Sequence, residues 1–246
     1  MKSLTKILLV AALITSAGYT YAKPVKTIKT KAYYDTQDRH LSGFSAVDVE
    51  GSFDVYITQG STESVIVDAP ADIMDHIVTE VNGGTLRIRD KRNNGWGGDW
   101  NNNHKKVTVH VTVRDINAIG ITGSGDVYFK DGIRAERLKI RVSGSGDAAG
   151  KIEVKTLECS VSGSGNIKIS GHAGDSNISV SGSGDYSGRE LPTANTSVQV
   201  SGSGNASINA SSSITASVSG SGDVSYTGGA QHVVKSKSGS GDISGN

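Results

Sequence analysis

Ile178-Ser179-Val180-Ser181-Gly182-Ser183-Gly184-Asp185-Tyr186 is the stretch that decides the fold, because close copies of it recur along the second half of the chain. The pentapeptide at its centre occurs seven times, with steps of 21, 19, 19, 20, 18 and 19 residues between copies. A fixed period near 20 residues is typical of a solenoid, in which each repeat buries its apolar face against its neighbours. The copies are Thr122–Asp126, Ser143–Asp147, Ser162–Asn166, Ser181–Asp185, Ser201–Asn205, Ser219–Asp223 and Ser238–Asp242.

Apolar and polar residues alternate on both sides of this pentapeptide. The position before it and the position two residues earlier are apolar in the first six copies, and a third apolar column follows the Asp or Asn. A period of two residues predicts half-buried strands, and no segment between the pentapeptides has helical periodicity. The sequence therefore predicts an all-β fold, a β-solenoid (β-helix) with coils of about 19 residues and parallel ladders of strands.

The acidic or amide residue of each pentapeptide forms a column of its own. Asp and Asn side chains accept hydrogen bonds from nearby backbone N–H groups and so stabilise turns. Stacked oxygens could instead hold Ca²⁺, but each turn offers one carboxyl group only. We expect a structural turn column and no resident cofactor or metal. The column consists of Asp126, Asp147, Asn166, Asp185, Asn205, Asp223 and Asp242.

The first half of the chain contains less regular strand patterns. Glu50-Gly51-Ser52-Phe53-Asp54 resembles the pentapeptide, and Val49 precedes Ile121 by 72 residues, which is close to four periods. We therefore expect one domain over residues 41–246, with irregular coils in 41–115 and regular repeats in 116–246. A separate N-terminal β-domain is the alternative.

The last repeat breaks the apolar columns. Lys235 and Lys237 occupy positions that are apolar in the six preceding copies. Lysine is a common way to protect the exposed edge of a sheet, so this repeat is expected to be a polar cap.

Residues 1–22 have the pattern of a secretory signal peptide: two lysines, a short apolar run and Thr20-Tyr21-Ala22 before a cleavage site. Residues 23–40 are polar and are expected to be a flexible lead-in. No segment is long and apolar enough for a transmembrane helix, so the protein should not be an integral membrane protein. With 25 basic and 24 acidic residues, no charge excess points to nucleic acid as a partner. We expect an exported protein of the periplasm or the cell surface.

The irregular segment 90–105 holds both tryptophans of the chain. Indole rings flanked by Asp and Asn suit stacking on sugar rings, with the polar side chains bonding to hydroxyl groups. Trp96, Asp99, Trp100 and Asn101 are therefore the candidate ligand-binding residues. No Ser/His/Asp arrangement, phosphate loop or metal-ligand spacing occurs, and we expect no catalytic residues. The single cysteine, Cys159, lies in an apolar column and is expected to be a buried structural thiol.

The order Val49-Glu50-Gly51-Ser52-Phe53-Asp54-Val55-Tyr56-Ile57, then Leu86-Arg87-Ile88, then repeated Ser-Gly-Ser-Gly-Asp/Asn resembles a bacterial exported family, the auto-transporter adhesins with a head GIN domain. The resemblance covers about residues 41–240. It implies a β-helical fold and a location in the envelope or at the surface.

The function expected from these observations is that of a noncatalytic exported β-solenoid, an adhesin or carbohydrate-binding protein of the cell envelope. A surface glycan or an envelope protein would be its partner. A periplasmic structural or scaffold protein is one alternative. A carbohydrate-active β-helix enzyme is the other, and the regular repeats leave room for its cleft only in the early coils.

Overall fold

A computed structural model describes residues 33–91 and 106–245, which lie in one compact unit spanning residues 32–246. Within these ranges the chain forms sixteen strands of a single sheet and one 3-10 turn, which confirms the all-β prediction. The elements are β1 (Tyr34–Asp38), β2 (Ala46–Gly51), β3 (Asp54–Gln59), β4 (Ser64–Pro70), η1 (Met74–His76), β5 (Ile77–Asn82), β6 (Thr85–Asp90), β7 (Thr108–Val113), β8 (Ala118–Gly123), β9 (Asp126–Gly144), β10 (Ala148–Gly163), β11 (Ile167–Gly182), β12 (Tyr186–Gly202), β13 (Ala206–Gly220), β14 (Val224–Thr227), β15 (His232–Gly239) and β16 (Ile243–Gly245).

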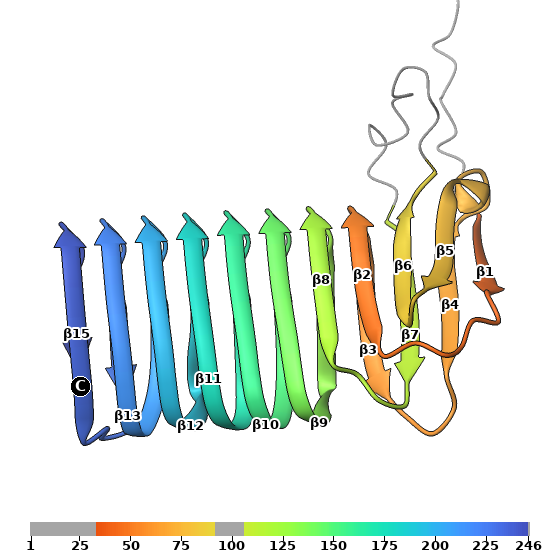
Figure 1. The fold of residues 1–246 in the computed structure, drawn as a ribbon. Coiled ribbons are helices and arrows are strands. Elements are labelled where there is room, and N and C mark those ends of the chain that lie inside the picture. The colour runs from red at the N-terminus through yellow and green to blue at the C-terminus, as the bar shows by residue number, and fades with distance from the viewer. Residues whose placement is uncertain (1–32, 92–105, 246) are drawn as a thin grey trace, which may run out of the picture. The chain divides into compact units, whose positions relative to one another are not determined.

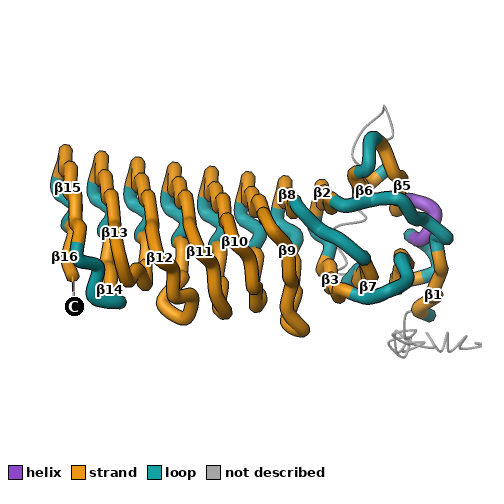
Figure 2. The backbone as a smooth tube through the Cα atoms, turned by 60° about the horizontal axis from the view of Figure 1, so that its bottom comes forward, coloured by secondary structure: helices purple, strands orange, loops and turns teal. Residues whose placement is uncertain are grey.

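The regular repeats build a β-solenoid with coils of about 19 residues, as the period predicts. Each of β9 to β13 is one long bent strand that pairs in parallel with the next, so that Val161, for example, pairs with Val142 and with Val180. Each coil contributes its first half to one ladder and its second half to another (Figures 1 and 2). We call the ladder that follows the Asp/Asn residue the first ladder and the one that precedes the pentapeptide the second ladder.

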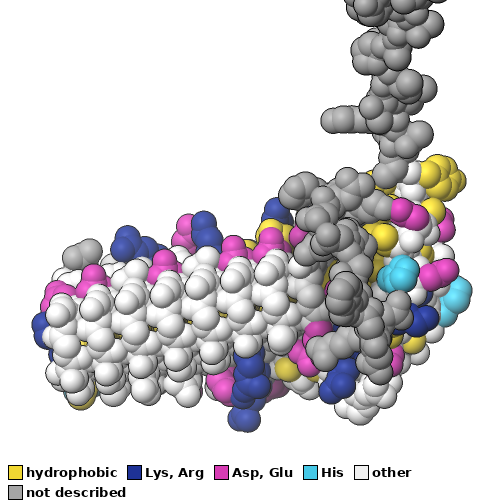
Figure 3. Space-filling view, turned by 90° about the horizontal axis from the view of Figure 1, so that it is seen from above, with side chains coloured by type: hydrophobic (Ala, Val, Ile, Leu, Met, Phe, Trp, Pro, Cys, Tyr) yellow, Lys and Arg dark blue, Asp and Glu magenta, His cyan; other side chains and the backbone are white. Residues whose placement is uncertain are grey.

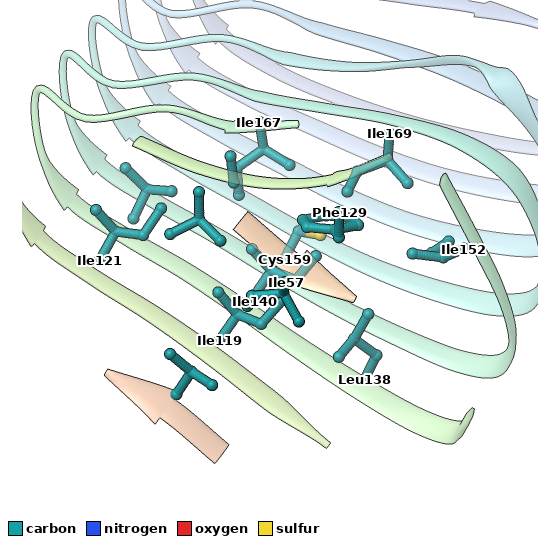
Figure 4. Close-up of a cluster of buried hydrophobic side chains, with 14 of the residues drawn as sticks. Ile57, Ile119, Ile121, Phe129, Leu138, Ile140, Ile152, Cys159, Ile167 and Ile169 are labelled. Carbon is teal, nitrogen blue, oxygen red and sulfur yellow. The ribbon is translucent and has the colours of Figure 1, made fainter. Parts of the chain in front are cut away.

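The core is the space inside the coils, and the alternating columns fill it. Figure 4 shows side chains such as Ile140, Cys159 and Ile167 pointing into this space from successive coils. All six apolar residues of the column before the pentapeptide are at most 1% exposed. They are Ile121, Val142, Val161, Val180, Val200 and Val218. Cys159 is a buried free thiol, as expected from its column.

Two glycines let consecutive pentapeptides stack closely. Gly182 has φ +118°, and a Cβ there would come closer than 3.0 Å to the carbonyl oxygen of Gly163 in the preceding coil. A Cβ on Gly184 would clash with the carbonyl oxygen of Gly165 in the same way. The approach allows the Gly182 carbonyl to accept two N–H groups of the next coil, from Ser203 and Gly204. Glycine is therefore required at both positions.

The early coils lie in an order that differs from the chain order. Strand β2 pairs in parallel with β8 on one side and with β6 on the other, and β3 lies in the same way between β9 and β7. Residues 46–59 are thus inserted next to the regular coils, while the later residues 85–113 lie beyond them (Figure 1). Val49 pairs directly with Ile121, so the interpretation of their spacing as four periods is wrong. The predicted counterpart of the pentapeptide is correctly placed, because Gly51 pairs with Gly123.

Antiparallel strands complete this end of the sheet. Strand β4 pairs with β7, β1 with β4, and β5 with β6. Larger side chains, including those of Phe44, Phe53 and Met74, are buried here. The segment predicted as a flexible lead-in differs from the expectation, since Tyr34–Asp38 forms β1 along the edge of β4. The remainder of the lead-in up to residue 32 and the signal segment lie outside the described residues. No helix among the described residues has the length and apolarity needed to cross a membrane.

The last repeat differs from the others in the way its sequence predicts. All eight residues of β15 are exposed, including Lys235 and Lys237. The Lys235 ammonium donates a hydrogen bond to the Ile243 carbonyl at 2.9 Å and lies 4.9 Å from the centroid of the Tyr226 ring. Lys235, which pairs with buried Ala216, therefore reaches across the open end of the last coil to the other ladder and caps it with a polar group.

Candidate functional site

The four residues predicted to bind a ligand, Trp96, Asp99, Trp100 and Asn101, lie outside the described residues. Carbohydrate binding by this loop therefore stays a prediction.

The Asp/Asn column runs along one corner of the coils as a hydrogen-bonded ladder. In each step, a side-chain oxygen accepts the backbone N–H of the equivalent residue in the next coil, at 2.7 to 3.0 Å. Asn166 and Asn205 also donate their amides to Asp147 and Asp185, at 2.9 and 3.0 Å. The two amides thus separate and bond to carboxylates that would otherwise repel one another across a coil spacing of about 4.8 Å.

This arrangement directs the oxygens of the column toward backbone donors. Among residues 33–91 and 106–245, no group of three or more His, Cys, Asp or Glu side chains could hold a metal ion. The expectation that the protein carries no cofactor and no Ca²⁺ stays a prediction.

Next to the Asp/Asn column, the Gly-Ser-Gly part of the pentapeptides forms a mainly uncharged corner. Figure 3 looks down on it and shows charged side chains mainly along its two sides. The exposed serines of the second ladder form part of this surface, for example Ser162, Ser181 and Ser201. Such a face offers many equivalent hydroxyl groups but no group that stands out chemically.

The first ladder carries a more distinctive outward column. Its successive members are His110, Tyr56 and Tyr128, which the insertion of β3 between β7 and β9 brings together. The Tyr56 ring stacks on both neighbours, with centroids 5.4 Å from His110 and 5.2 Å from Tyr128. The Tyr128 hydroxyl donates to the Asp126 carboxylate at 3.2 Å. Burial, and then the nearby Asp126 charge, raise the pKa of Tyr128 to about 12.

The column changes abruptly after Tyr128. The next coil places Ala149 there, and the coil after that places Lys168. One face of the Tyr128 ring is stacked on Tyr56, and the next coil places only the Ala149 methyl group beside the ring. The Lys130 ammonium of the same strand also lies over the ring. Because Tyr128 and Lys168 are two coils apart, about 9.6 Å separates their backbones. The result is a slot one coil wide, with Tyr128 on one side, Lys168 on the other and Ala149 as its floor.

The slot opens onto a depression of about 490 Å³, which we call the basic depression. It spans β9 to β12, and two of the three pairings within it are interrupted by register shifts: β9–β10 after Gly150 and β11–β12 after Lys168. Irregularities of this kind are frequent next to binding sites, where they redirect side chains. The lining residues are Lys130, Ala149, Gly150, Lys151, Lys168, Ile169, Ser170, Ser187, Arg189 and Glu190.

Positive charge dominates the basic depression. Lys130, Lys151, Lys168 and Arg189 are all exposed, and Glu190 is the one acidic residue of the lining. Lys130 lies 5.6 Å from the centroid of the Tyr128 ring. Arg189 is 3.4 Å from the Ser225 hydroxyl.

A second depression, of about 600 Å³, lies beside the first and is lined by Gln59, Asp131, Arg134 and Glu153 among others. Apart from Lys151, which lines both depressions, its charged groups already have partners. Arg134 forms an ion pair with Glu153 at 3.0 Å, and Asp131 accepts a hydrogen bond from Thr58 at 3.3 Å. Gln59 bonds to the backbone of residues 114 and 134. This hollow therefore offers fewer free groups to a ligand than the basic depression.

Nothing in the described part of the chain resembles a catalytic centre. His110 is half exposed and lies 3.4 Å from the Asp68 carboxylate, but no nucleophilic side chain bonds to its other nitrogen there. Burial raises the pKa of the Cys159 thiol well above its usual range, so the thiol is a poor nucleophile. The sequence prediction missed the basic depression. The column order Tyr128, Ala149, Lys168 is the signal that could have revealed it.

The chain matches the model of a family described as "Putative auto-transporter adhesin, head GIN domain" over residues 43–230. Among solved structures, a "putative adhesin" from Bacteroides fragilis is 24% identical, with a TM-score of 0.80, over 88% of this chain and 98% of that one. A "putative lipid binding protein" from Parabacteroides distasonis is also 24% identical, with a TM-score of 0.70, over 87% and 96%. A "putative adhesin" from Parabacteroides merdae is 19% identical, with a TM-score of 0.69, over 87% and 96%. At these identities the likeness concerns the fold. No curated protein matches the chain in sequence.

Proposed function

Since the chain belongs to the family described as "Putative auto-transporter adhesin, head GIN domain", we propose that it is a noncatalytic carbohydrate-binding protein of the adhesin type. It acts in the bacterial cell envelope, in the periplasm or at the cell surface. The carbohydrate binds on the first ladder, at the slot beside Tyr128.

The observation that carries this proposal is the Tyr128 ring, which has an aromatic neighbour in only one of the two adjacent coils. The Lys130 ammonium, 5.6 Å from the ring centroid, would move aside for a ligand. Stacking on Tyr56 holds the ring in place, with centroids 5.2 Å apart. The adjacent coil offers only the Ala149 methyl group, so a flat ring can lie over it. The apolar face of a sugar packs against an aromatic ring, while its hydroxyl groups need hydrogen-bond partners. Ser170 and Ser187 in the same depression supply them.

The uniform architecture supports binding rather than catalysis. Coils with nearly identical corners present the same groups several times at a spacing of about 4.8 Å. Weak contacts that repeat along a rod add up when the ligand is itself a polymer. An adhesin can exploit this property, whereas an enzyme needs one cleft with dissimilar groups.

The test measures binding of purified protein to a panel of neutral and charged polysaccharides by affinity electrophoresis. Two substitutions probe the slot in different ways: Tyr128→Ala removes the ring, and Ala149→Leu fills the floor while the ring stays. Both should weaken binding about tenfold or more, which corresponds to the loss of one stacking contact of about 1.4 kcal/mol. Tyr34→Ala is the matched control, because Tyr34 is 50% exposed on β1.

The thermal unfolding midpoints of the variants show whether each has kept its fold. Unchanged binding in both slot variants would refute the assignment of the site. If no polysaccharide binds and crosslinking in cells captures an envelope protein instead, the scaffold alternative is correct. Turnover of any polysaccharide would favour the enzyme alternative.

The location is tested by adding protease to intact expressing cells, with a known periplasmic protein as the control. Digestion of the protein while the control stays intact places it at the surface. Protection until the outer membrane is opened places it in the periplasm and excludes direct adhesion to surfaces.

A further inference from the structure

We infer that the basic depression selects anionic polysaccharides, with the carboxylate of a uronic acid bound by Lys151 and Lys168. This inference rests on the proposed function, because it names the class of carbohydrate that the Tyr128 slot accepts.

The first argument is the absence of counter-charges. Three basic side chains elsewhere on the coils pair with carboxylates: Lys139 with Glu158, Lys155 with Glu136, and Arg134 with Glu153. In contrast, Lys151 and Lys168 have no carboxylate partner anywhere in the described ranges, and Glu190 alone faces the four cations of the depression. An excess of cations with no internal partner favours an anionic ligand, which would supply the missing charge.

The second argument is the position of these cations relative to the slot. Lys168 follows Ala149 in the same outward column. Lys151 lies two residues after the floor residue Ala149, at the point where the register with β9 shifts. A uronic acid carries its carboxylate at the rim of the sugar ring. With the ring face on Tyr128, the rim lies toward Lys151 along the strand, and the long Lys168 side chain can reach the same carboxylate from the opposite side of the slot.

Lysine suits this role because its ammonium is a compact charge with three rotatable donors on a flexible stem. It can follow a carboxylate on a ligand that lies loosely in an open depression. Charge-assisted hydrogen bonds of this kind are stronger than those between neutral groups. The charge should therefore decide between two polymers that offer the same hydroxyl groups.

The third argument is the length of the charged surface. The four cations come from the coils of β9, β10, β11 and β12, so they extend over three coil spacings, about 14 Å. Beyond Lys168 the column continues with Ser187 and Ser207, which are uncharged. Such a short patch fits a few sugar residues of a polymer. It does not provide the long basic surface that nucleic acid requires.

The experiment compares polygalacturonate and alginate with their carboxyl-reduced forms, which keep the sugar chain but lack the charge. We expect the full exported chain to bind at least one of the acidic polymers about tenfold or more tighter than its reduced form. Raising the ionic strength to about 1 M, where the Debye length is about 3 Å, should abolish most of this difference.

The double variant Lys151→Gln/Lys168→Gln should lower the affinity for the acidic polymer about tenfold or more, as expected for the loss of two charge-assisted hydrogen bonds. Its affinity for the reduced polymer should not change. The control is Lys155→Gln/Lys237→Gln, which removes the same charge from exposed residues outside the depression. It should bind both forms like the unmodified protein.

The outcomes separate the two proposals. Equal binding of the acidic and reduced polymers, lost in Tyr128→Ala, would overturn the charge selection and leave the proposed function standing. An equal loss of affinity in the control variant would also overturn the inference, because net charge alone would then explain the binding. If neither form of any polysaccharide binds, the proposed function itself fails.

Discussion

Replacement of Gly182 by alanine tests whether close contact between pentapeptides holds the solenoid together. The backbone there has φ +118°, a conformation that costs an L-residue about 1–3 kcal/mol. The new methyl group would also press on the Gly163 carbonyl of the preceding coil. Relief of that clash moves the pentapeptide and weakens the two hydrogen bonds that the Gly182 carbonyl accepts, each of which contributes about 1 kcal/mol.

Alanine also lowers the conformational entropy of the unfolded chain, and this effect stabilises the folded state by about 0.4–1 kcal/mol. We therefore expect Gly182→Ala to lower the free energy of unfolding by about 3 kcal/mol. The assay is urea unfolding followed by circular dichroism, and the m value should stay the same so that the midpoints can be compared.

Two matched variants separate the contributions. Gly132 has φ +93° with nothing within 4 Å of its added Cβ, so Gly132→Ala keeps the backbone penalty and lacks the clash. We expect it to cost about 1 kcal/mol. Ser183→Ala removes an exposed hydroxyl of the same pentapeptide and should change stability by less than about 0.5 kcal/mol. If Gly182→Ala costs no more than Gly132→Ala, the reasoning about close stacking is refuted.

Three further predictions concern other columns. Asn166→Asp removes the amide that bonds to Asp147 and places a third carboxylate between Asp147 and Asp185. This variant should lower the free energy of unfolding by about 1–2 kcal/mol at neutral pH. Its neighbours raise the pKa of the new carboxyl, so lowering the pH through that pKa should restore the stability. Urea midpoints that do not depend on pH would contradict this. Cys159 should resist alkylation in the folded protein and react on unfolding, because burial raises its pKa, and mass spectrometry of iodoacetamide-treated samples measures the difference. The raised pKa of Tyr128, about 12, implies that its contribution to stability is full below about pH 10 and is lost as the pH rises toward 12. Absorbance at alkaline pH, compared with Tyr128→Phe, should show one phenol ionising late.

Much of the regular stack can be predicted from the sequence because each coil repeats the same physical problem. An apolar residue at every second position must point into the coil, so the buried columns follow from alternation alone. The glycines follow as well, since a pentapeptide that stacks on its own copy has no room for a Cβ. Even the exposed lysines of β15 follow, because Lys235 and Lys237 cannot replace apolar residues in the core.

The early coils could not be predicted in the same way. A spacing of 72 residues between Val49 and Ile121 fits four sequential coils, yet the two residues are direct neighbours. Nothing local in residues 46–59 encodes which strands lie on either side, because several parallel strands of similar composition compete for those places. The stacking of Tyr56 on Tyr128 depends on this arrangement, and so does the slot beside it.

The insertion of residues 46–59 between later segments also determines the order in which the protein can fold. A simple solenoid can grow coil by coil as the chain emerges, because each new coil finds its neighbour already present. Here β2 and β3 cannot pair until β6 to β9 have been synthesised. These partner strands lie between about 40 and 70 residues further along the chain. Closing such long loops costs chain entropy before the new contacts stabilise the fold. Folding is therefore slow. The rate-limiting step should therefore be the capture of this N-terminal segment, after which the regular coils can be added one at a time by zippering.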